Sequence, residues 1–271
     1  RERFLSSGAA SAPEGAAVSR ERVALLRTQL AERLLVLDGA MGTALQAAGL
    51  GPDDFGGPQY EGCNEHLVVT RPAAVRAVHA AHLAAGADIV ETDTFGGTPL
   101  VLGEYGLAAR ARELNAAAAR LARETAAAFA TAEKPRFVAG SLGPTTKAIS
   151  VTGGVTFAEL RQHYREQALG LLEGGVDLLL VETVQDARNA KAALLGIGEA
   201  QRALGAGIPV AISGTIERNG TTLGGQTIEA FLTSVRHAEP LFVGLNCATG
   251  PDFMTDHLRA LAALAPFPVC C

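Results

Sequence analysis

Tryptophan is absent from this chain of 271 residues, and aromatic residues make up only 5% of it. No apolar run approaches the roughly 20 residues of a membrane-spanning helix, and no signal peptide is present, so we expect no membrane partner. Excess positive charge is also lacking, because the net charge is −5, and this argues against nucleic acid as a partner. The four cysteines are too few for a disulfide scaffold, so we expect a cytoplasmic protein.

What is present suits one large α/β domain. Hydrophobic residues make up 48% of the chain, and since few are aromatic, the core must be aliphatic. Such a core is typical of (β/α)8 barrels, which need about 250 residues. Residues 1–19 are small and polar and predict a disordered leader, and residues 20–271 predict the domain. The chain starts at Arg1 and stops at Cys271, so we expect the domain to be C-terminally incomplete.

Short apolar segments alternate with helical patterns along the whole domain. We predict seven strands, at residues 34–37, 88–91, 137–140, 177–181, 209–212, 241–246 and 267–269. Unbroken alternation implies parallel strands, and the predicted fold is an α/β TIM barrel truncated before its eighth strand. Two segments echo each other, Asp88 to Glu91 and Asp177 to Glu182, with the same side-chain parity. A doubly wound sheet stays an alternative, although no dinucleotide-binding glycine fingerprint follows a strand.

Each of the first six predicted strands ends in polar residues, and in a barrel those ends meet at the active-site rim. These residues are Asp38, Glu91 with Asp93, Ser141, Glu182, Ser213, and Asn246 with Cys247. Glu182 follows four apolar residues, and a buried carboxylate there needs a cationic partner or a proton. A substrate ammonium group is one candidate partner, and a structural ion pair with Lys191 or Arg188 is the other.

Three further features each have two interpretations. The turn around Gly39 frees backbone N–H groups that could bind an anion, or it is a tight turn without a ligand. Cys247 is either a ligand at a strand end or a small buried hydrophobe. Cys270 and Cys271 could complete a three-thiolate zinc site, but adjacent strand residues point to opposite faces, so we predict that they are core residues of the seventh strand.

Two predictions concern segments outside the strands. Residues 49–67 are rich in glycine and proline and predict a long loop that covers the site. His79 and His82 are three residues apart in a predicted helix, and we expect both on its exposed surface rather than as metal ligands.

Six motifs, in order, resemble one known family. They are Asp38-Gly-Ala-Met-Gly-Thr43, Gly86-Ala-Asp-Ile-Val-Glu-Thr-Asp-Thr-Phe95, Gly140-Ser-Leu-Gly-Pro144, Val181-Glu-Thr183, Ser213-Gly-Thr215 and Gly244-Leu-Asn-Cys247. Over residues 33 to 269 the chain resembles the homocysteine-binding module of the homocysteine S-methyltransferases. The resemblance is closest to the N-terminal module of the cobalamin-dependent methionine synthases.

The resemblance implies a (β/α)8 barrel that holds Zn²⁺ through three cysteine thiolates, one of which corresponds to Cys247. The family takes the other two from a Gly-Gly-Cys-Cys-Gly motif, which this chain lacks, although Cys270 and Cys271 remain the alternative ligands. The resemblance also implies that the homocysteine carboxylate meets the backbone amides of Gly39, Ala40 and Met41. Its ammonium group would then meet Glu182, and Asp38 and Asn246 would line the same pocket.

By the same resemblance, the zinc-bound thiolate of homocysteine attacks a methyl group and gives methionine, with Cys247 as the catalytic ligand. The donor is methylcobalamin, recharged from methyltetrahydrofolate, and both are held by other modules of the full-length protein. We expect this chain alone to bind zinc weakly and to turn over poorly. Two alternatives stay open: a stand-alone methyltransferase that uses betaine or S-methylmethionine, and a metal-free barrel lyase or aldolase that uses Glu91 and Glu182 as acid and base.

Overall fold

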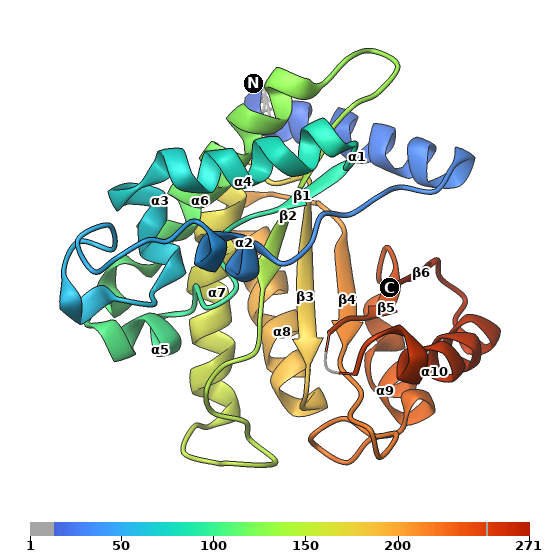
Figure 1. Ribbon diagram of the computed structural model, residues 1–271. Coiled ribbons are helices and arrows are strands. Elements are labelled where there is room, and N and C mark those ends of the chain that lie inside the picture. Colours follow the sequence, from blue (N-terminus) through green and yellow to red (C-terminus); the bar gives the residue numbers. More distant parts are fainter. Residues whose placement is uncertain (1–13, 248) are drawn as a thin grey trace, which may run out of the picture.

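The computed structural model describes residues 14–247 and 249–271, in which one curled parallel sheet is covered by helices (Figure 1). Six strands pair in the order of the chain, so each crossover leads to the neighbouring strand. They are β1 (Ile89–Glu91), β2 (Phe137–Leu142), β3 (Leu178–Val184), β4 (Val210–Gly214), β5 (Val243–Leu245) and β6 (Val269–Cys270). This sheet is part of a barrel wall, which confirms the α/β class and agrees with a truncated barrel.

Helices separate the strands, as the alternating sequence pattern predicts. They are α1 (Glu14–Glu32), α2 (Met41–Ala47), α3 (Leu67–Thr70), α4 (Pro72–Ala85), α5 (Pro99–Leu102), α6 (Ala111–Phe129), α7 (Phe157–Gly174), α8 (Ala187–Leu204), α9 (Ile228–Val235) and α10 (Pro251–Leu264). Helix α1 begins within the predicted leader, and residues 1–13 lie outside the described residues. No helix in the described ranges is both long and apolar enough to cross a bilayer.

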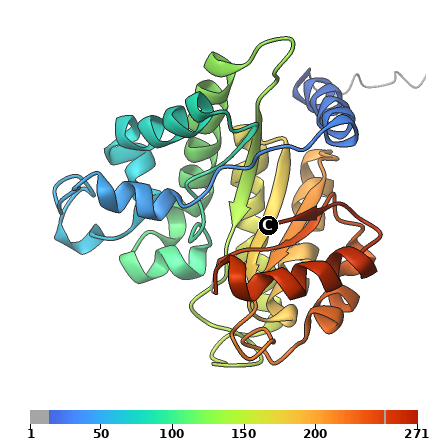
Figure 2. The same ribbon diagram turned by 45° about the vertical axis from the view of Figure 1, so that its right-hand side comes forward.

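The two faces of the sheet carry different side chains, because strand residues alternate between them. The outer face packs against the helices and contributes residues such as Val138, Leu179, Ile212 and Val243 to the largest core cluster. The inner, concave face has a second cluster with Phe137, Leu178, Ala211 and Phe242 near the amino ends of the strands. Figure 2 shows the curl of the sheet, with β6 at one edge.

Helix α1 lies across the amino ends of the strands (Figure 1) and joins the inner cluster through Leu26. Its residue Arg22 pairs with Asp177 at 2.6 Å, and Arg33, just after the helix, pairs with Asp88 at 2.9 Å. Each aspartate also accepts a backbone N–H from the neighbouring strand or segment, of Val138 and Val36 respectively. The segments that begin at Asp88 and Asp177 therefore start with the same two contacts: an ion pair with an arginine and a hydrogen bond from a backbone N–H.

The predicted strand at residues 34–37 is wrong in extent. Only Leu37 forms a bridge, to Ile89, and it is parallel. Leu34 is 92% exposed and Val36 is 56% exposed. The apolar residues predict a buried strand here, but the segment has a neighbour on one side only. Leu35 and Leu37 pack against the inner cluster, whereas Leu34 and Val36 are uncovered.

The prediction for the C-terminal cysteines is confirmed for one residue only. Cys270 lies in β6 and packs against the inner cluster, and burial raises the pKa of its thiol to about 11. Cys271 follows the strand and is exposed, so it is not a core residue. Adjacent residues of an extended chain point to opposite faces, so only Cys270 faces the inner cluster.

Candidate functional site

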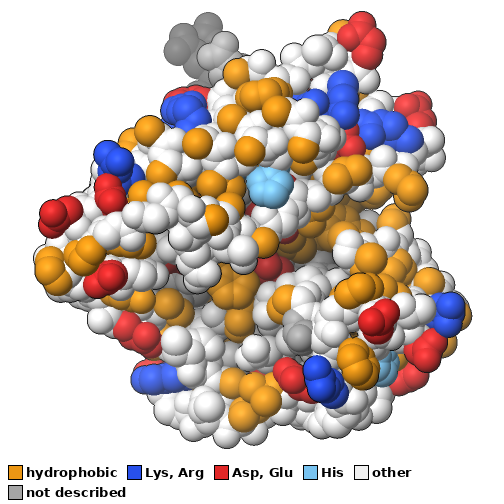
Figure 3. Space-filling view, in the orientation of Figure 1, with side chains coloured by type: hydrophobic (Ala, Val, Ile, Leu, Met, Phe, Trp, Pro, Cys, Tyr) orange, Lys and Arg blue, Asp and Glu red, His pale blue; other side chains and the backbone are white. Residues whose placement is uncertain are grey.

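Polar side chains replace apolar ones on the inner face where the strands end. Glu91, Ser141, Glu182, Ser213 and Asn246 follow inner-face residues of β1 to β5 at even spacing. Figure 3 shows a hollow in the face of the molecule that is open in this view, with acidic side chains inside it. The predicted gathering of strand ends is therefore present, and it is acidic.

Three carboxyl groups dominate the electrostatics of this hollow. Burial raises the pKa of Asp38 to about 7, and the charge of Glu182 adds to the shift. Burial also raises the pKa of Glu91 well above its usual value, helped by the charges of Glu182 and Asp38. The pKa of Glu182 is raised by burial, although hydrogen bonds from neighbouring groups oppose the shift.

Glu182 has hydroxyl partners rather than a cation. Ser141 Oγ donates to Glu182 Oε1 at 2.5 Å, and Thr183 Oγ1 donates to Oε2 at 3.5 Å. No ion pair of the described residues includes Glu182, so the predicted alternative of a pair with Lys191 or Arg188 is wrong. The charge of this carboxylate is left for a ligand or a proton.

Asn246 ties three strands together at the rim. Its Oδ1 accepts from Thr183 N at 3.0 Å and from Ser213 Oγ at 2.6 Å, and its Nδ2 donates to Thr183 Oγ1 at 2.7 Å. Thr215 Oγ1 donates to the Asn246 carbonyl at 2.9 Å. Thr183 and Thr215 have no role in the sequence-based prediction, because their contacts depend on the exact register of three strands.

Cys247 follows Asn246 at the exposed rim, not among aliphatic side chains. Its Sγ lies 3.5 Å from Thr215 Oγ1 and 3.5 Å from Asn246 Nδ2, and its φ of 49° is positive. The described residues contain no group of three or more His, Cys, Asp or Glu side chains arranged to hold a metal ion. A catalytic zinc site needs three protein ligands, so these residues do not by themselves fit the predicted zinc.

The turn before α2 has the form that its glycines predict. Ala40 adopts a left-handed conformation, with φ 39° and ψ 52°, and α2 begins at Met41. The N–H groups of Gly39, Ala40 and Met41 have no acceptor among the described residues. Asp38 is fixed at the start of this turn, because its Oδ1 accepts the N–H of Glu91 at 2.8 Å.

A second acidic group lies where the loop of residues 49–67 meets the segment after β1. Glu65 Oε1 accepts the N–H of Gly96 at 2.5 Å, and Cys63 Sγ lies 3.9 Å from Glu65 Oε2. Asp93 is 4% exposed, and its Oδ2 has no partner among the described residues. Burial, followed by the charge of Glu65, raises its pKa well above the usual value. The loop thus contacts the segment after β1, and Asp93 has Glu65 as its acidic neighbour.

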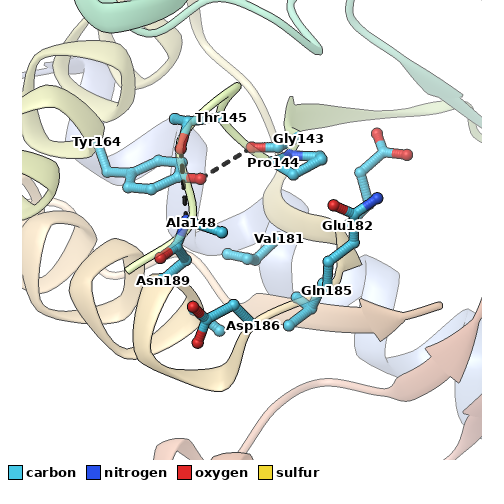
Figure 4. A pocket seen from close by; sticks show the side chains of 12 residues that line it. Gly143, Pro144, Thr145, Ala148, Tyr164, Val181, Glu182, Gln185, Asp186 and Asn189 are labelled. Atoms are coloured by element: carbon cyan, nitrogen blue, oxygen red, sulfur yellow. Dashed lines mark hydrogen bonds between the residues drawn. The ribbon is translucent and has the colours of Figure 1, made fainter. Parts of the chain in front are cut away.

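A small pocket lies behind β3, between α7 and α8 (Figure 4). Tyr164 Oη donates to the Gly143 carbonyl at 3.0 Å, and Asn189 Nδ2 donates to Thr145 Oγ1 at 3.4 Å. Glu182 lies at the edge of the pocket opposite Tyr164 (Figure 4). The volume of about 20 Å³ is room for one water molecule, so this pocket belongs to the packing of the loop after β2.

Comparison with known proteins agrees with this geometry. The sequence model of a family described as "Homocysteine S-methyltransferase" matches residues 35–271. The methionine synthase of Mycobacterium tuberculosis (strain ATCC 25618 / H37Rv) is 46% identical over 240 residues, which are 89% of this chain and 20% of that protein. The methionine synthase of Mycobacterium leprae (strain TN) is 46% identical over 245 residues, 90% of this chain and 20% of that protein. The chain spans about a fifth of the length of these relatives.

Solved structures show the same arrangement of strands and helices. The metallated form of the homocysteine methyltransferase MmuM from Escherichia coli has a TM-score of 0.74 and 25% identity, and the match covers 91% of this chain and 84% of that one. The oxidized form of that enzyme has a TM-score of 0.75 at 24% identity, and it supports the fold alone.

A curled parallel sheet with polar residues at the carboxyl ends of its strands defines the class of barrel-type α/β catalytic domains. Within that class, the chain belongs to the homocysteine S-methyltransferase family.

Proposed function

We propose that this domain, residues 20–271, binds homocysteine and presents its thiol as the methyl acceptor in a methyltransferase of the methionine synthase type. The family membership supports this function, and one observation carries it: Glu182 is a largely buried carboxylate on the inner face with no cation of the described chain beside it. Such a group is matched by a ligand that brings its own positive charge.

The amino-acid end of the ligand would be held by groups around the hollow. Its ammonium group would meet Glu182, and Asp38 and Asn246 would line the same space. Its carboxylate would accept hydrogen bonds from the N–H groups of Gly39, Ala40 and Met41, which have no acceptor among the described residues. These contacts leave the thiol end free to reach the rim at Cys247.

Methyl transfer forms a carbon–sulfur bond, breaks the bond between methyl and donor, and releases the thiol proton. Free thiols titrate near about 8.5, so the thiol has to be activated at neutral pH. We propose that Cys247 would be one ligand of a zinc ion in a longer protein, and that this ion would supply the activation of the thiol. The donor would be methylcobalamin, recharged from methyltetrahydrofolate, on other modules of the same chain. The four free cysteines suit a cytoplasmic location.

Calorimetric titration with homocysteine tests the amino-acid site. We expect Glu182→Gln to weaken binding by about 10- to 100-fold, because it removes one charge-assisted hydrogen bond. Glu133→Gln, which changes an exposed glutamate in the same way, should leave binding unchanged. Equal binding of homocysteine and its analogue without the amino group would contradict the proposed role of Glu182.

Metal analysis tests the zinc proposal separately. In the full-length protein, dialysed Cys247→Ala should lose zinc, whereas Cys63→Ala, which removes a buried thiol outside the site, should retain it. Retention of zinc by the Cys247 variant would overturn the assignment. Assays with betaine and S-methylmethionine as donors, beside methylcobalamin, distinguish the alternative methyltransferases.

A further inference from the structure

Ser141 turns its backbone N–H and C=O groups toward a strand that has already ended. The last residue of β1, Glu91, lies opposite Ala139 of β2. The Ala139 carbonyl accepts the N–H of Thr92 at 2.9 Å, so Ala139 bonds to the β1 side of the sheet. Ser141 is two residues further along β2 and faces the same side, beyond the last strand pair. Because it is 1% exposed, both of its backbone groups need partners within the protein.

Two threonine hydroxyl groups take the place of the missing strand and close a circuit on Ser141. The N–H of Ser141 donates to Thr92 Oγ1 at 3.0 Å, and Thr94 Oγ1 donates to the Ser141 carbonyl at 2.7 Å. The two hydroxyl oxygens lie 2.6 Å apart. A hydroxyl group has one hydrogen, and that of Thr94 goes to Ser141, so Thr92 is the donor between them. The direction of every bond in the circuit is therefore fixed, and each bond strengthens the next.

Gln167 reaches the same place from α7. Its Nε2 donates to the Thr94 carbonyl at 2.7 Å and to the Ser141 carbonyl at 3.2 Å. Gly97 leaves the space for this side chain, since a Cβ atom at Gly97 would lie 2.9 Å from Gln167 Nε2. Thr92, Thr94 and Gln167 are each at most 2% exposed, so water is not available to replace these bonds.

The circuit occupies the backbone of Ser141 and leaves its side chain free for a further contact. Ser141 Oγ donates to Glu182 Oε1 at 2.5 Å, and Glu182 lies on the neighbouring strand β3. A purely structural role would need only the backbone bonds of Ser141. The bond from its side chain connects the circuit to the carboxylate that is the proposed partner of the ligand.

We propose that Thr92, Thr94 and Gln167 are positioning residues, which fix Ser141 so that its hydroxyl group donates to Glu182 and holds that carboxylate in the direction of the hollow. The inference rests on the proposed function, because Glu182 meets the ligand there. Each of the three residues acts through Ser141 and not by contact with the ligand.

Titration of the full chain with homocysteine tests this role. Thr94→Val keeps the shape of the side chain and removes the hydroxyl group, and we expect it to weaken binding about 3- to 10-fold. Thr94→Ser keeps the hydroxyl group and should bind within about twofold of the unmodified protein. Thr125→Val is the matched control, because Thr125 is 3% exposed and its hydroxyl group donates to the Leu121 carbonyl at 2.7 Å within α6. The control should lose stability, as Thr94→Val does, but keep its affinity.

A double-mutant cycle gives a readout that a merely structural role would not change. Ser141→Ala should weaken binding about 10-fold, because Glu182 loses a hydrogen bond to its charged group. If Thr94 acts through Ser141, adding Thr94→Val to Ser141→Ala should cost no further affinity. Additive losses in the cycle, or equal losses of affinity in Thr94→Val and Thr125→Val, overturn the inference. Gln167→Met removes the donor with a side chain of similar shape, and it replaces Thr94→Val in the cycle if that variant does not fold.

Glu182→Gln, measured in the same titration, separates this inference from the proposed function. If Glu182→Gln weakens binding and Thr94→Val does not, the positioning role is overturned and the proposed function stands. If Glu182→Gln binds homocysteine as the unmodified protein does, the proposed role of Glu182 fails, and the positioning role fails with it.

Discussion

Asn246 and Thr183 are joined by two hydrogen bonds of opposite direction. Thr183 N donates to Asn246 Oδ1 at 3.0 Å, and Asn246 Nδ2 donates to Thr183 Oγ1 at 2.7 Å. Thr183 has a φ of 54°, which is unusual for a β-branched residue, and the pairing of β3 with β4 is irregular between Val181 and Val184. Asn246 therefore holds the irregular end of β3 that follows Glu182 and fixes its direction.

We expect Asn246→Ala to lower the free energy of unfolding by about 1–3 kcal/mol, because the N–H of Thr183 loses its acceptor in a partly buried site. Denaturant titration measures this change, and binding of homocysteine should weaken in the same variant. Asn219→Ala is the matched control: Asn219 Oδ1 also accepts two hydrogen bonds, from Thr221, but in an exposed turn where water replaces them. A loss of stability in the control equal to that of Asn246→Ala would contradict the stabilising role of the hydrogen bonds between Asn246 and Thr183.

Much of the site was predictable from the sequence, because it follows from strand parity. Glu91, Ser141, Glu182, Ser213 and Asn246 are predicted strand ends, and all lie at or next to the carboxyl ends of parallel strands, whereas Asp38 follows a single bridge at Leu37. The conformation of Thr183 and the bonds of Asn246 were not predictable, since they depend on a bulge that composition does not reveal. Burial was the other failure: His79 was expected on a surface, yet it is fully buried on α4, a helix that packs against α6.

The buried His79 predicts a loss of stability in mild acid. Both ring nitrogens lack a partner in the part of the chain that the structure describes, and burial lowers the pKa of the imidazole from 6.5 to about 4. The neutral form is favoured in the folded state, so its full contribution is present above pH 6.5 and is lost as the pH falls toward 4. The resulting decrease in the free energy of unfolding reaches about 3 kcal/mol for His79. Unfolding measured from pH 7 to 4 should show a smaller decline in His79→Leu than in the unmodified protein, whereas His82→Leu, on the same helix and partly exposed, should show the original decline.

The ion pairs of Asp177 predict a stability difference between buried and exposed aspartates. Asp177 is 2% exposed, pairs with Arg22 and Arg123, and accepts the N–H of Val138. Removing it by Asp177→Ala leaves partly buried charges without a partner, and we expect a loss of about 3 kcal/mol in denaturant titration. Asp256→Ala breaks the exposed pair with Arg259 and should cost less than about 1 kcal/mol. Comparable losses in the two variants would show that α1 is not held to the strands by this contact.

Two glycines two residues apart in α8 predict opposite effects of the same substitution. A Cβ atom at Gly196 would lie 2.4 Å from the Arg161 carbonyl oxygen of α7, a backbone atom that cannot move aside cheaply. Gly196→Ala should therefore push α7 and α8 apart and lower the melting temperature, with a cost of about 1–3 kcal/mol. At Gly198 the nearest atom is the mobile guanidinium of Arg202, 3.3 Å away, so Gly198→Ala should gain up to about 1 kcal/mol from helix propensity. Thermal unfolding of both variants decides the matter, because a stabilising Gly196→Ala would mean that α7 and α8 do not pack at this distance.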